Sequence, residues 1–375
     1  MDGNRIRSDR KGAICMTDRQ MRDLLARLID IRTEESEGAQ AAVLREICES
    51  RGAAVTVDEV APGRFNFSAA FPGDLPGPSW MFEAHGDTVP GGGPFRLDEA
   101  EDRVYGRGAC DTKASLVAML AAILRAKGKG LLKGNVRFVS TCSEETGGEG
   151  ARALAASIPK PGMTVIGEPT GLKIVRAHKG AWRTKIGTRG KAAHSSNPDA
   201  GVNAIVAMCA VIRALETEFA PRLAAVRNGL LGSPTLSVGT IHGGRAANIV
   251  PDECSIEVDW RLVPETGMED LLEQLRIRFP AATVEPYEFY PPFFEPDDSP
   301  VLARLASAVR EVTGLPAVLA GAPWAANAGI LQYEAGWSCA IFGPGDISRA
   351  HTADEYVEWS QVELAAQVYE RLLES

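Results

Sequence analysis

Histidine, aspartate and glutamate recur at the ends of apolar runs, or in the loops that follow them, at several points of this sequence. The side chains concerned are His85, Asp87, Asp111, Glu144, Glu145, Glu168 and His351. Taken singly, Asp111 is also typical of an acidic helix start, and Glu144 of a charged loop. Because ligands of an open α/β sheet gather beyond the carboxyl ends of its strands, we expect these side chains to meet at one edge of a sheet.

These residue types together indicate metal chemistry. A mixture of imidazole nitrogens and carboxylate oxygens suits Zn²⁺, Mn²⁺ or Co²⁺, and the lack of cysteine at these positions argues against a closed structural zinc site. With one bridging carboxylate, five such ligands hold two ions about 3.5–4 Å apart and leave room for a bridging water. The pattern therefore predicts a centre with two divalent metal ions, most simply Zn²⁺, that is built for hydrolysis.

The order and context of the motifs resemble a known enzyme family. The motifs are HGDTVP, GRGACDTK, SEE, GEP and AHTADEYV, in that order along the chain. From about Thr17 onward the sequence is similar to the zinc-dependent aminoacylases and exopeptidases, a group of M20-type metallopeptidases. This family includes acetylornithine deacetylase, succinyl-diaminopimelate desuccinylase and glutamate carboxypeptidase.

The resemblance implies a role for each residue of these motifs. The implied metal ligands are His85, Asp111, Glu145, Glu168 and His351, with Asp111 bridging the two ions. Asp87 would accept the second ring N–H of His85 and so fix its tautomer. Glu144 would act as the general base that takes a proton from the attacking water.

Three further residues are implied between the fourth and fifth ligands. By itself His194, in RGKAAHSSNPDAG, is typical of an exposed loop. The family resemblance instead implies that it reaches the active site of a partner subunit and stabilises the oxyanion there. Asn248 and Arg261 are implied to engage a substrate carboxylate, although Arg261 could simply pair with Asp259 or Glu257 on its own strand.

One segment departs from the family pattern. Related deacetylases for basic or diacid substrates usually carry Thr, Asp or Glu where this chain has AGAPWAANAGIL at 320–331. The segment offers Trp324, Ala325, Ala326 and Asn327 instead. An apolar wall of this kind provides no partner for an ornithine ammonium group, so we expect a less polar or aromatic substrate.

The arrangement of apolar patterns predicts an α/β fold with an inserted domain. Strand-like runs alternate with helical patterns, which indicates a mostly parallel sheet. Between residues 180 and 291 the order becomes β-α-β-β-α-β, the pattern of a ferredoxin-like α+β unit. We therefore expect a disordered tail at 1–16, a catalytic metal-binding domain at 17–179 and 292–375, and a lid or dimerisation domain at 180–291.

Composition restricts the partners and the compartment. The 375 residues carry 49 Asp and Glu against 40 Lys and Arg, and a net charge of −9 argues against a nucleic-acid binder. No apolar run approaches the roughly 18 residues of a membrane helix, and no secretory signal is evident. Seven cysteines without a C-x-x-C pair are typical of free thiols in a reduced compartment. We expect a cytoplasmic protein with a small-molecule substrate, and the resemblance implies a homodimer or higher homo-oligomer.

Three functions are compatible with these residues. The first is hydrolysis of the amide C–N bond of a small carboxylate-bearing N-acyl amino acid or a related compound. The second is a hydrolytic deaminase that releases ammonia from an activated aryl amine on the same metal site. The third is a non-catalytic metal-binding or assembly protein, which Glu144 and Asp87 disfavour because a binder needs no general base.

Overall fold

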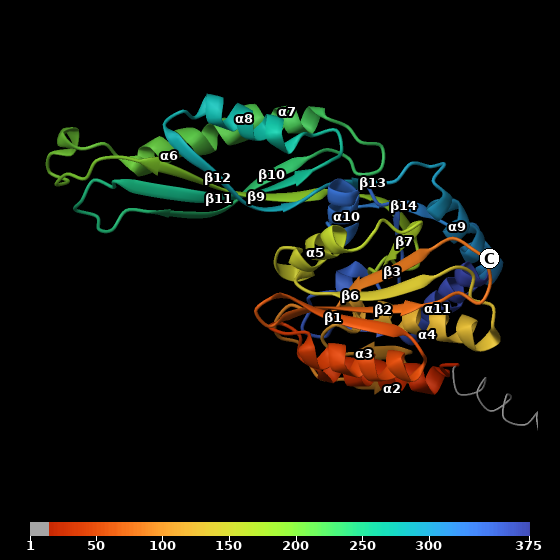
Figure 1. Ribbon diagram of the computed structural model, residues 1–375. Helices are drawn as coiled ribbons and strands as arrows, with labels where there is room; N and C mark the ends of the chain where they lie inside the picture. The colour runs from red at the N-terminus through yellow and green to blue at the C-terminus, as the bar shows by residue number, and fades with distance from the viewer. Residues whose placement is uncertain (1–14) are drawn as a thin grey trace, which may run out of the picture. The chain divides into compact units, whose positions relative to one another are not determined.

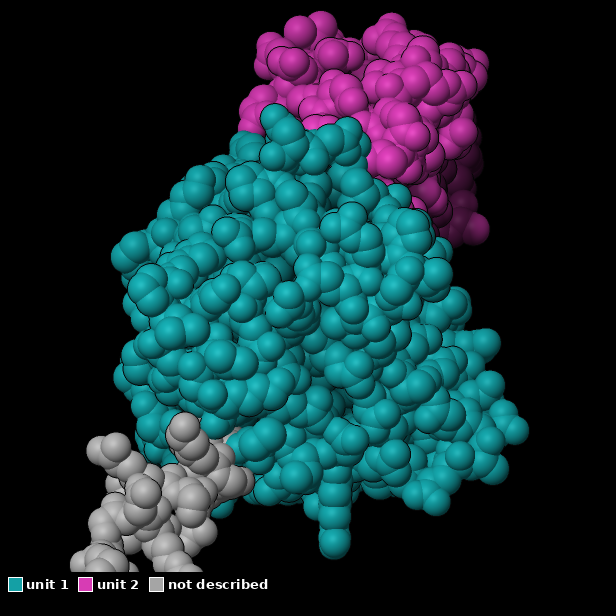
Figure 2. All heavy atoms as spheres, turned by 90° about the vertical axis from the view of Figure 1, so that its right-hand side faces the viewer, with its two compact units in different colours: residues 1–176, 295–320, 326–375 teal, residues 177–294, 321–325 magenta. Residues whose placement is uncertain are grey.

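The computed structural model describes residues 15–375, which divide into two compact units (Figure 2). The first unit holds the described residues up to Arg176 together with Glu295–Ala320 and Ala326–Ser375. The second unit comprises Ala177–Phe294 and Gly321–Ala325. Gly321–Ala325 thus groups with the second unit, although it lies outside the range 180–291 that we expected for the inserted domain. Of the expected tail, residues 1–14 lie outside the described part of the chain.

A large mixed sheet forms the centre of the first unit (Figure 1). In the described residues its order is β1-β2-β6-β3-β7-β15-β8-β13, and β14 also pairs with β8. The strands are β1 (Ala54–Ala61), β2 (Arg64–Phe71), β3 (Trp80–His85), β6 (Val136–Thr141), β7 (Met163–Ile166), β8 (Ile174–His178), β13 (Phe293–Phe294), β14 (Leu319–Ala322) and β15 (Cys339–Ile341).

The predicted α/β class is confirmed, but the sheet is mixed rather than mostly parallel, and its parallel part is the middle. Strands β6, β3, β7 and β15 run parallel to one another. Strands β1 and β2 on one side, and β8 and β13 on the other, pair antiparallel. Because the four central strands share a direction, their carboxyl ends and the loops that follow them lie at one edge.

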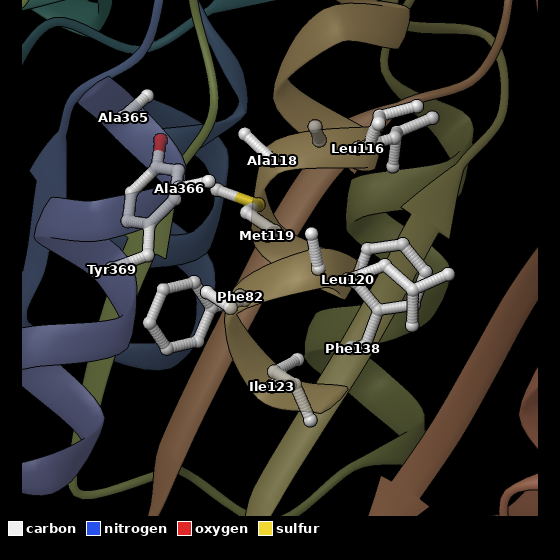
Figure 3. Close-up of a cluster of buried hydrophobic side chains, with 14 of the residues drawn as sticks. Phe82, Leu116, Ala118, Met119, Leu120, Ile123, Phe138, Ala365, Ala366 and Tyr369 are labelled. Carbon is white, nitrogen blue, oxygen red and sulfur yellow. The ribbon is translucent and has the colours of Figure 1, made fainter. Parts of the chain in front are cut away.

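Helices cover both faces of this sheet. Along β3, Phe82 points to one face, where its ring meets Tyr369 of α11 (Trp359–Glu374) at a centroid distance of 5.4 Å. Figure 3 shows the same core with side chains of α4 (Ala114–Lys129) beside Phe82. The next residue, Glu83, points to the opposite face and accepts a hydrogen bond from Asn327 at the start of α10 (Asn327–Ala335). This alternation is the two-residue period of a strand buried on both sides.

Five further α-helices and a small second sheet complete the described part of the first unit. Its other helices are α2 (Asp18–Asp30), α3 (Gly38–Ser50), α5 (Glu149–Ser157), α9 (Pro300–Thr313) and α10 (Asn327–Ala335). Helix α2 begins as predicted at Thr17, whose hydroxyl accepts the N–H of Gln20 in a capping box. A separate three-stranded sheet, β16-β5-β4, joins β16 (Tyr356–Glu358), β5 (Arg103–Tyr105) and β4 (Arg96–Asp98).

The second unit has the predicted ferredoxin-like order. Its elements are β9 (Gly180–Arg189), α6 (Ala204–Ala214), α7 (Ala220–Ala225), β10 (Thr235–Gly243), β11 (Glu253–Leu262), α8 (Met268–Arg278) and β12 (Ala282–Tyr290). The four strands pair antiparallel in the order β10-β11-β9-β12. Trp182 and Trp260, on neighbouring strands, pack in its core with ring centroids 5.5 Å apart. The short helix α7 was not predicted.

The cysteines and the lengths of the helices bear on two expectations from the sequence. All seven cysteines are free thiols, as predicted. Among the described residues, none of the helices combines the length and the apolar character that crossing a membrane requires.

Candidate metal centre

Two overlapping groups of potential metal ligands lie in the first unit. One group is His85, Asp111 and Glu168, and the other is Asp111, Glu145 and His351. Within each group, one ligand atom from every residue lies within 4.8 Å of the others. Asp111 belongs to both groups, which is the arrangement expected of a carboxylate that bridges two ions.

The first group is built at the carboxyl ends of neighbouring parallel strands. His85 is the last residue of β3, and Glu168 lies two residues beyond β7. Nε2 of His85 lies 2.9 Å from Oδ1 of Asp111. His85, Asp111 and Glu168 are all buried, so an ion held here would be largely shielded from solvent.

The second group draws on loops with strained backbone. Nε2 of His351 lies 2.9 Å from Oε1 of Glu145 and 3.3 Å from Oδ2 of Asp111. His351 itself has a φ of 63°, and Ser143, just before the Glu144–Glu145 turn, has a φ of 58°. Non-glycine residues seldom adopt this left-handed conformation, and such strain tends to collect at functional sites.

The electrostatics of the cluster favour bound cations. Removal from solvent and neighbouring carboxylates raise the pKa of Glu144 and of Glu168 well above the usual value. Burial alone would raise the pKa of Asp111, but hydrogen bonds from His351 and His85 lower it overall. Carboxylates packed this closely repel one another unless positive charge stands between them. Divalent ions bound by these oxygens and imidazole nitrogens would supply that charge, so the residues present fit two such ions.

Comparison with known proteins identifies the family. The model of peptidase family M20/M25/M40 matches residues 81–375. The chain belongs to this family. An acetylornithine deacetylase from Aliivibrio fischeri is 30% identical over 348 residues, which covers 88% of this chain and 89% of the relative. As a member of the M20 family, the chain is an enzyme, a metal-dependent amidohydrolase.

Solved structures agree with the fold. A tripeptidase from Staphylococcus aureus superposes with a TM-score of 0.81 at 23% identity, covering 96% of this chain and 98% of that one. A dinuclear metal-binding peptidase of the M20 family from Bacillus subtilis gives a TM-score of 0.71 at 16% identity, covering 95% of this chain and 97% of that one. These likenesses show that this M20 enzyme shares their fold.

Asp87 contacts both the His85 ring and the turn that carries Glu144 and Glu145. Nδ1 of His85 lies 2.9 Å from the main-chain oxygen of Asp87 but 3.6 Å from its carboxylate, so the carbonyl is the nearer partner. The carboxylate instead accepts the main-chain N–H groups of Glu144, at 3.0 Å, and Glu145, at 3.1 Å. Arg64 lies 3.5 Å from the same carboxylate. The side chain of Asp87 therefore holds the turn that carries Glu144 and Glu145, while its main-chain oxygen makes the closer contact with the His85 ring.

Glu144 lies close to both groups of potential ligands. It is half-buried beside the ligands, yet neither of the two ligand groups found in the described residues includes it. Its main chain is fixed through Asp87, so the carboxylate is held next to Glu145 without being needed as a ligand. A carboxylate in this position can accept a proton from a water molecule between the ligand groups.

His194, Asn248 and Arg261 all belong to the second unit. The structure brings His194 and Asn248 together, because the N–H of Ser195 donates to the main-chain oxygen of Asn248 at 3.1 Å. The exposed His194 ring makes a 2.8 Å contact with the Ser196 hydroxyl. Arg261 donates from Nε to Asp259 at 2.8 Å, which is one of the two pairings on its own strand that the sequence allows.

Several residues near the centre escaped prediction. Glu83 and Asn327 are both buried, and Nδ2 of Asn327 donates to Glu83 at 3.0 Å. Asn327, which we named in the apolar wall expected of segment 320–331, is therefore bound to Glu83 in the first unit. Lys113 is also buried and donates to the main-chain oxygens of Leu28 and Ile31 at the end of α2. Only their positions in the sequence could have pointed to these residues. Glu83 stands two residues before His85, and Lys113 stands two residues after Asp111.

Proposed function

We propose that this enzyme hydrolyses the amide bond of a small carboxylate-bearing N-acyl amino acid or a related compound, using two divalent ions, most simply Zn²⁺. The sharing of Asp111 between two ligand groups carries the proposal. The relatives named acetylornithine deacetylase support the amide class. Mn²⁺ and Co²⁺ suit the same oxygen and nitrogen ligands, so the metal is to be determined by loading each ion in turn.

Each residue of the centre then has a defined task. His85, Asp111, Glu145, Glu168 and His351 would hold the ions, with Asp111 between them. When bound, such ions polarise the scissile carbonyl and lower the pKa of the attacking water. Glu144 takes the proton from that water and passes it to the leaving amine. Asp87 keeps Glu144 in place by accepting its main-chain N–H.

Residues of the second unit complete the proposal for substrate binding. His194 would stabilise the oxyanion of the tetrahedral intermediate in the partner subunit, and Asn248 and Arg261 would engage the substrate carboxylate. Asp259 already binds Arg261, so a substrate carboxylate would have to compete with it or share the guanidinium. Trp324 is half-buried and its indole carries no charge, which supports our expectation of a less polar or aromatic acyl group.

We also propose a homodimer formed through the second unit. Strand β10 is an edge strand of the four-stranded sheet and is exposed along most of its length. Exposed apolar side chains accompany it, namely Val202, Val206, Ile241 and Ile249. An exposed edge strand with apolar neighbours is a ready surface for pairing with a second copy. A cytoplasmic location is supported by the seven free thiols.

A substrate panel tests the proposed reaction. The metal-loaded enzyme is assayed with N-acetyl and N-acyl derivatives of basic, acidic, aliphatic and aromatic amino acids, and separately with aryl amines. We expect release of free amine from N-acyl amino acids, fastest for aliphatic or aromatic members. Ammonia release from aryl amines without amide hydrolysis would instead establish the deaminase alternative and overturn the proposal.

A further inference from the structure

The main chain at Asp111 is fixed by a carboxylate from the far end of the sequence. Glu355 is buried, with 1% of its surface exposed. Its Oε1 accepts two consecutive main-chain N–H groups, from Cys110 at 2.9 Å and from Asp111 at 3.0 Å. Its other oxygen, Oε2, accepts Nη1 of Arg107 at 2.5 Å. Both carboxylate oxygens are therefore used, and both point into the segment that carries the shared ligand.

Further hydrogen bonds hold both Glu355 and Arg107 in place. The main-chain oxygen of Glu355 accepts the N–H of Gly106 at 3.0 Å, next to the pairing of Tyr356 with Tyr105 between β16 and β5. Nε of Arg107 donates to the main-chain oxygen of Gly91 at 3.2 Å. The acceptor oxygen of Glu355 thus stands in a fixed place, and the N–H groups of Cys110 and Asp111 must align with it.

Glu355 also links the two halves of the candidate centre. It follows the ligand His351 by four residues, and it bonds to the main chain of the ligand that both groups share. One short segment, 351–355, therefore supplies a ligand of one group and holds Asp111, which belongs to both. Partners that orient metal ligands typically change metal affinity about 10–100-fold when they are removed.

We propose that Glu355 is a positioning residue that sets Asp111 between the two metal sites through the acceptor atom Oε1. The inference rests on the metal centre of the proposed function. It predicts that affinity for both ions depends on an acceptor of the correct length at position 355. The ion pair with Arg107 is secondary, because the other oxygen, Oε2, makes it.

A matched pair of double variants separates the acceptor from the ion pair. Arg107→Met with Glu355→Gln removes both charges but keeps an oxygen that can reach the two N–H groups. Arg107→Met with Glu355→Ala also removes both charges, but it removes that oxygen together with the rest of the side chain beyond Cβ. The single variant Glu355→Asp retains the charge but withdraws the acceptor by about 1.5 Å, one C–C bond. If the alanine variant does not fold, Glu355→Asp still tests whether the position of the acceptor oxygen matters.

Glu295 provides a control of the same kind. It is a buried carboxylate that accepts the N–H of Cys339 at 3.1 Å. Cys339 begins β15, so this contact lies at the amino end of the parallel strands, opposite the ligands. Glu295→Ala should lower stability, as loss of any such buried acceptor does, without changing metal affinity.

The measurement is Zn²⁺ affinity by competition with a chelator, together with the absorption spectrum of the Co²⁺-loaded protein. We expect the Gln double variant to bind both ions within about threefold of the unchanged protein and with the same spectrum. The Ala double variant and Glu355→Asp should bind about 10–100-fold more weakly, with an altered spectrum. Equal affinities across all variants would overturn this inference and leave the proposed function standing. A loss of affinity in Glu295→Ala as large as in the Glu355 variants would do the same. Absence of metal binding in the unchanged protein would overturn the proposed function as well.

Discussion

Each oxygen of the Asp111 carboxylate faces a different histidine, and this geometry defines the centre at the residue scale. Oδ1 lies 2.9 Å from Nε2 of His85, and Oδ2 lies 3.3 Å from Nε2 of His351. Glu168 completes one group and Glu145 the other. Glu144 is adjacent to Glu145 but belongs to neither group, so binding of the ions and transfer of the proton are assigned to different side chains.

Glu144→Gln tests that division of labour. The substitution keeps the size of the side chain and removes its ability to take a proton. We expect kcat to fall by about 10²–10⁴, with metal content unchanged, because general-base catalysis typically contributes that much. Glu149→Gln, an exposed neighbour at the start of α5, should leave kcat unchanged. A loss of less than about tenfold in Glu144→Gln would show that another group is the base.

Metal binding should release protons. In the metal-free protein, hydrogen bonds to Asp111 and Glu145 raise the pKa of His351 to about 10, so this ring is protonated at neutral pH. A metal ligand must be the neutral imidazole, so the proton leaves when the ion binds and affinity rises with pH up to about that value. Calorimetric titration with Zn²⁺ in two buffers of different protonation enthalpy counts these protons. His242→Gln should not change the count, and zero release at neutral pH would contradict the account.

At the scale of elements, long apolar segments were predictable and short ones were not. Strands β3, β6 and β7 and the whole β-α-β-β-α-β order of the second unit follow from runs that are apolar or alternate over several residues. Strands β4, β5 and β16 have three residues each, too few to show a period. Strand β2, with the sequence RFNFSAAF, was missed because its polar and small residues interrupt the pattern.

The sequence predicted which residues belong to the candidate site better than it predicted what each of them contacts. Motifs that follow strand ends identify candidate ligands because a parallel sheet collects its carboxyl ends at one edge. They do not reveal which main-chain groups a carboxylate binds. The Asp87 side chain meets N–H groups 57 and 58 residues away, and Glu355 meets N–H groups 244 and 245 residues away. Such contacts depend on tertiary structure rather than on a local pattern.

The glycine that follows β15 is expected to be indispensable. A Cβ on Gly343 would stand 2.6 Å from the main-chain oxygen of Glu168 and 2.6 Å from the Ser115 hydroxyl. Gly343→Ala should therefore displace the backbone of Glu168, lower stability by about 1–3 kcal/mol, and weaken metal binding. Chemical denaturation and chelator competition measure the two effects. Gly93→Ala, where a Cβ meets nothing within 4 Å, serves as the control, and equal behaviour of the two variants would contradict the prediction.

At the scale of the whole molecule, the second unit is expected to join two copies of the chain. Ile241 in the edge strand β10 is 52% exposed, and Ile277 in α8 is 70% exposed. Helix α8 packs on β12, at the other edge of the sheet from β10. Ile241→Lys should convert a dimer into monomers, whereas Ile277→Lys should leave the dimer intact. Light scattering after size exclusion measures the mass of each variant. If Ile241→Lys remains a dimer while Ile277→Lys becomes a monomer, the interface lies elsewhere.

The net charge of −9 does not describe the charge at the proposed metal centre. Two divalent ions would add four positive charges at the point where the carboxylates are most crowded. The acidic balance still disfavours a nucleic-acid partner, but it does not make the active site strongly negative. An anionic substrate, such as the carboxylate-bearing compounds proposed above, is therefore compatible with an acidic chain.

The most direct test of the account is the number of divalent ions bound per chain, measured by elemental analysis of the unchanged protein and of Asp111→Ala. We expect about two ions per chain in the unchanged protein, because two ligand groups share one carboxylate. Asp111→Ala should bind at most one ion, and amide hydrolysis should disappear with it. Two tightly bound ions in Asp111→Ala, or full activity of the unchanged protein after a chelator has removed its metal, would contradict the central claim.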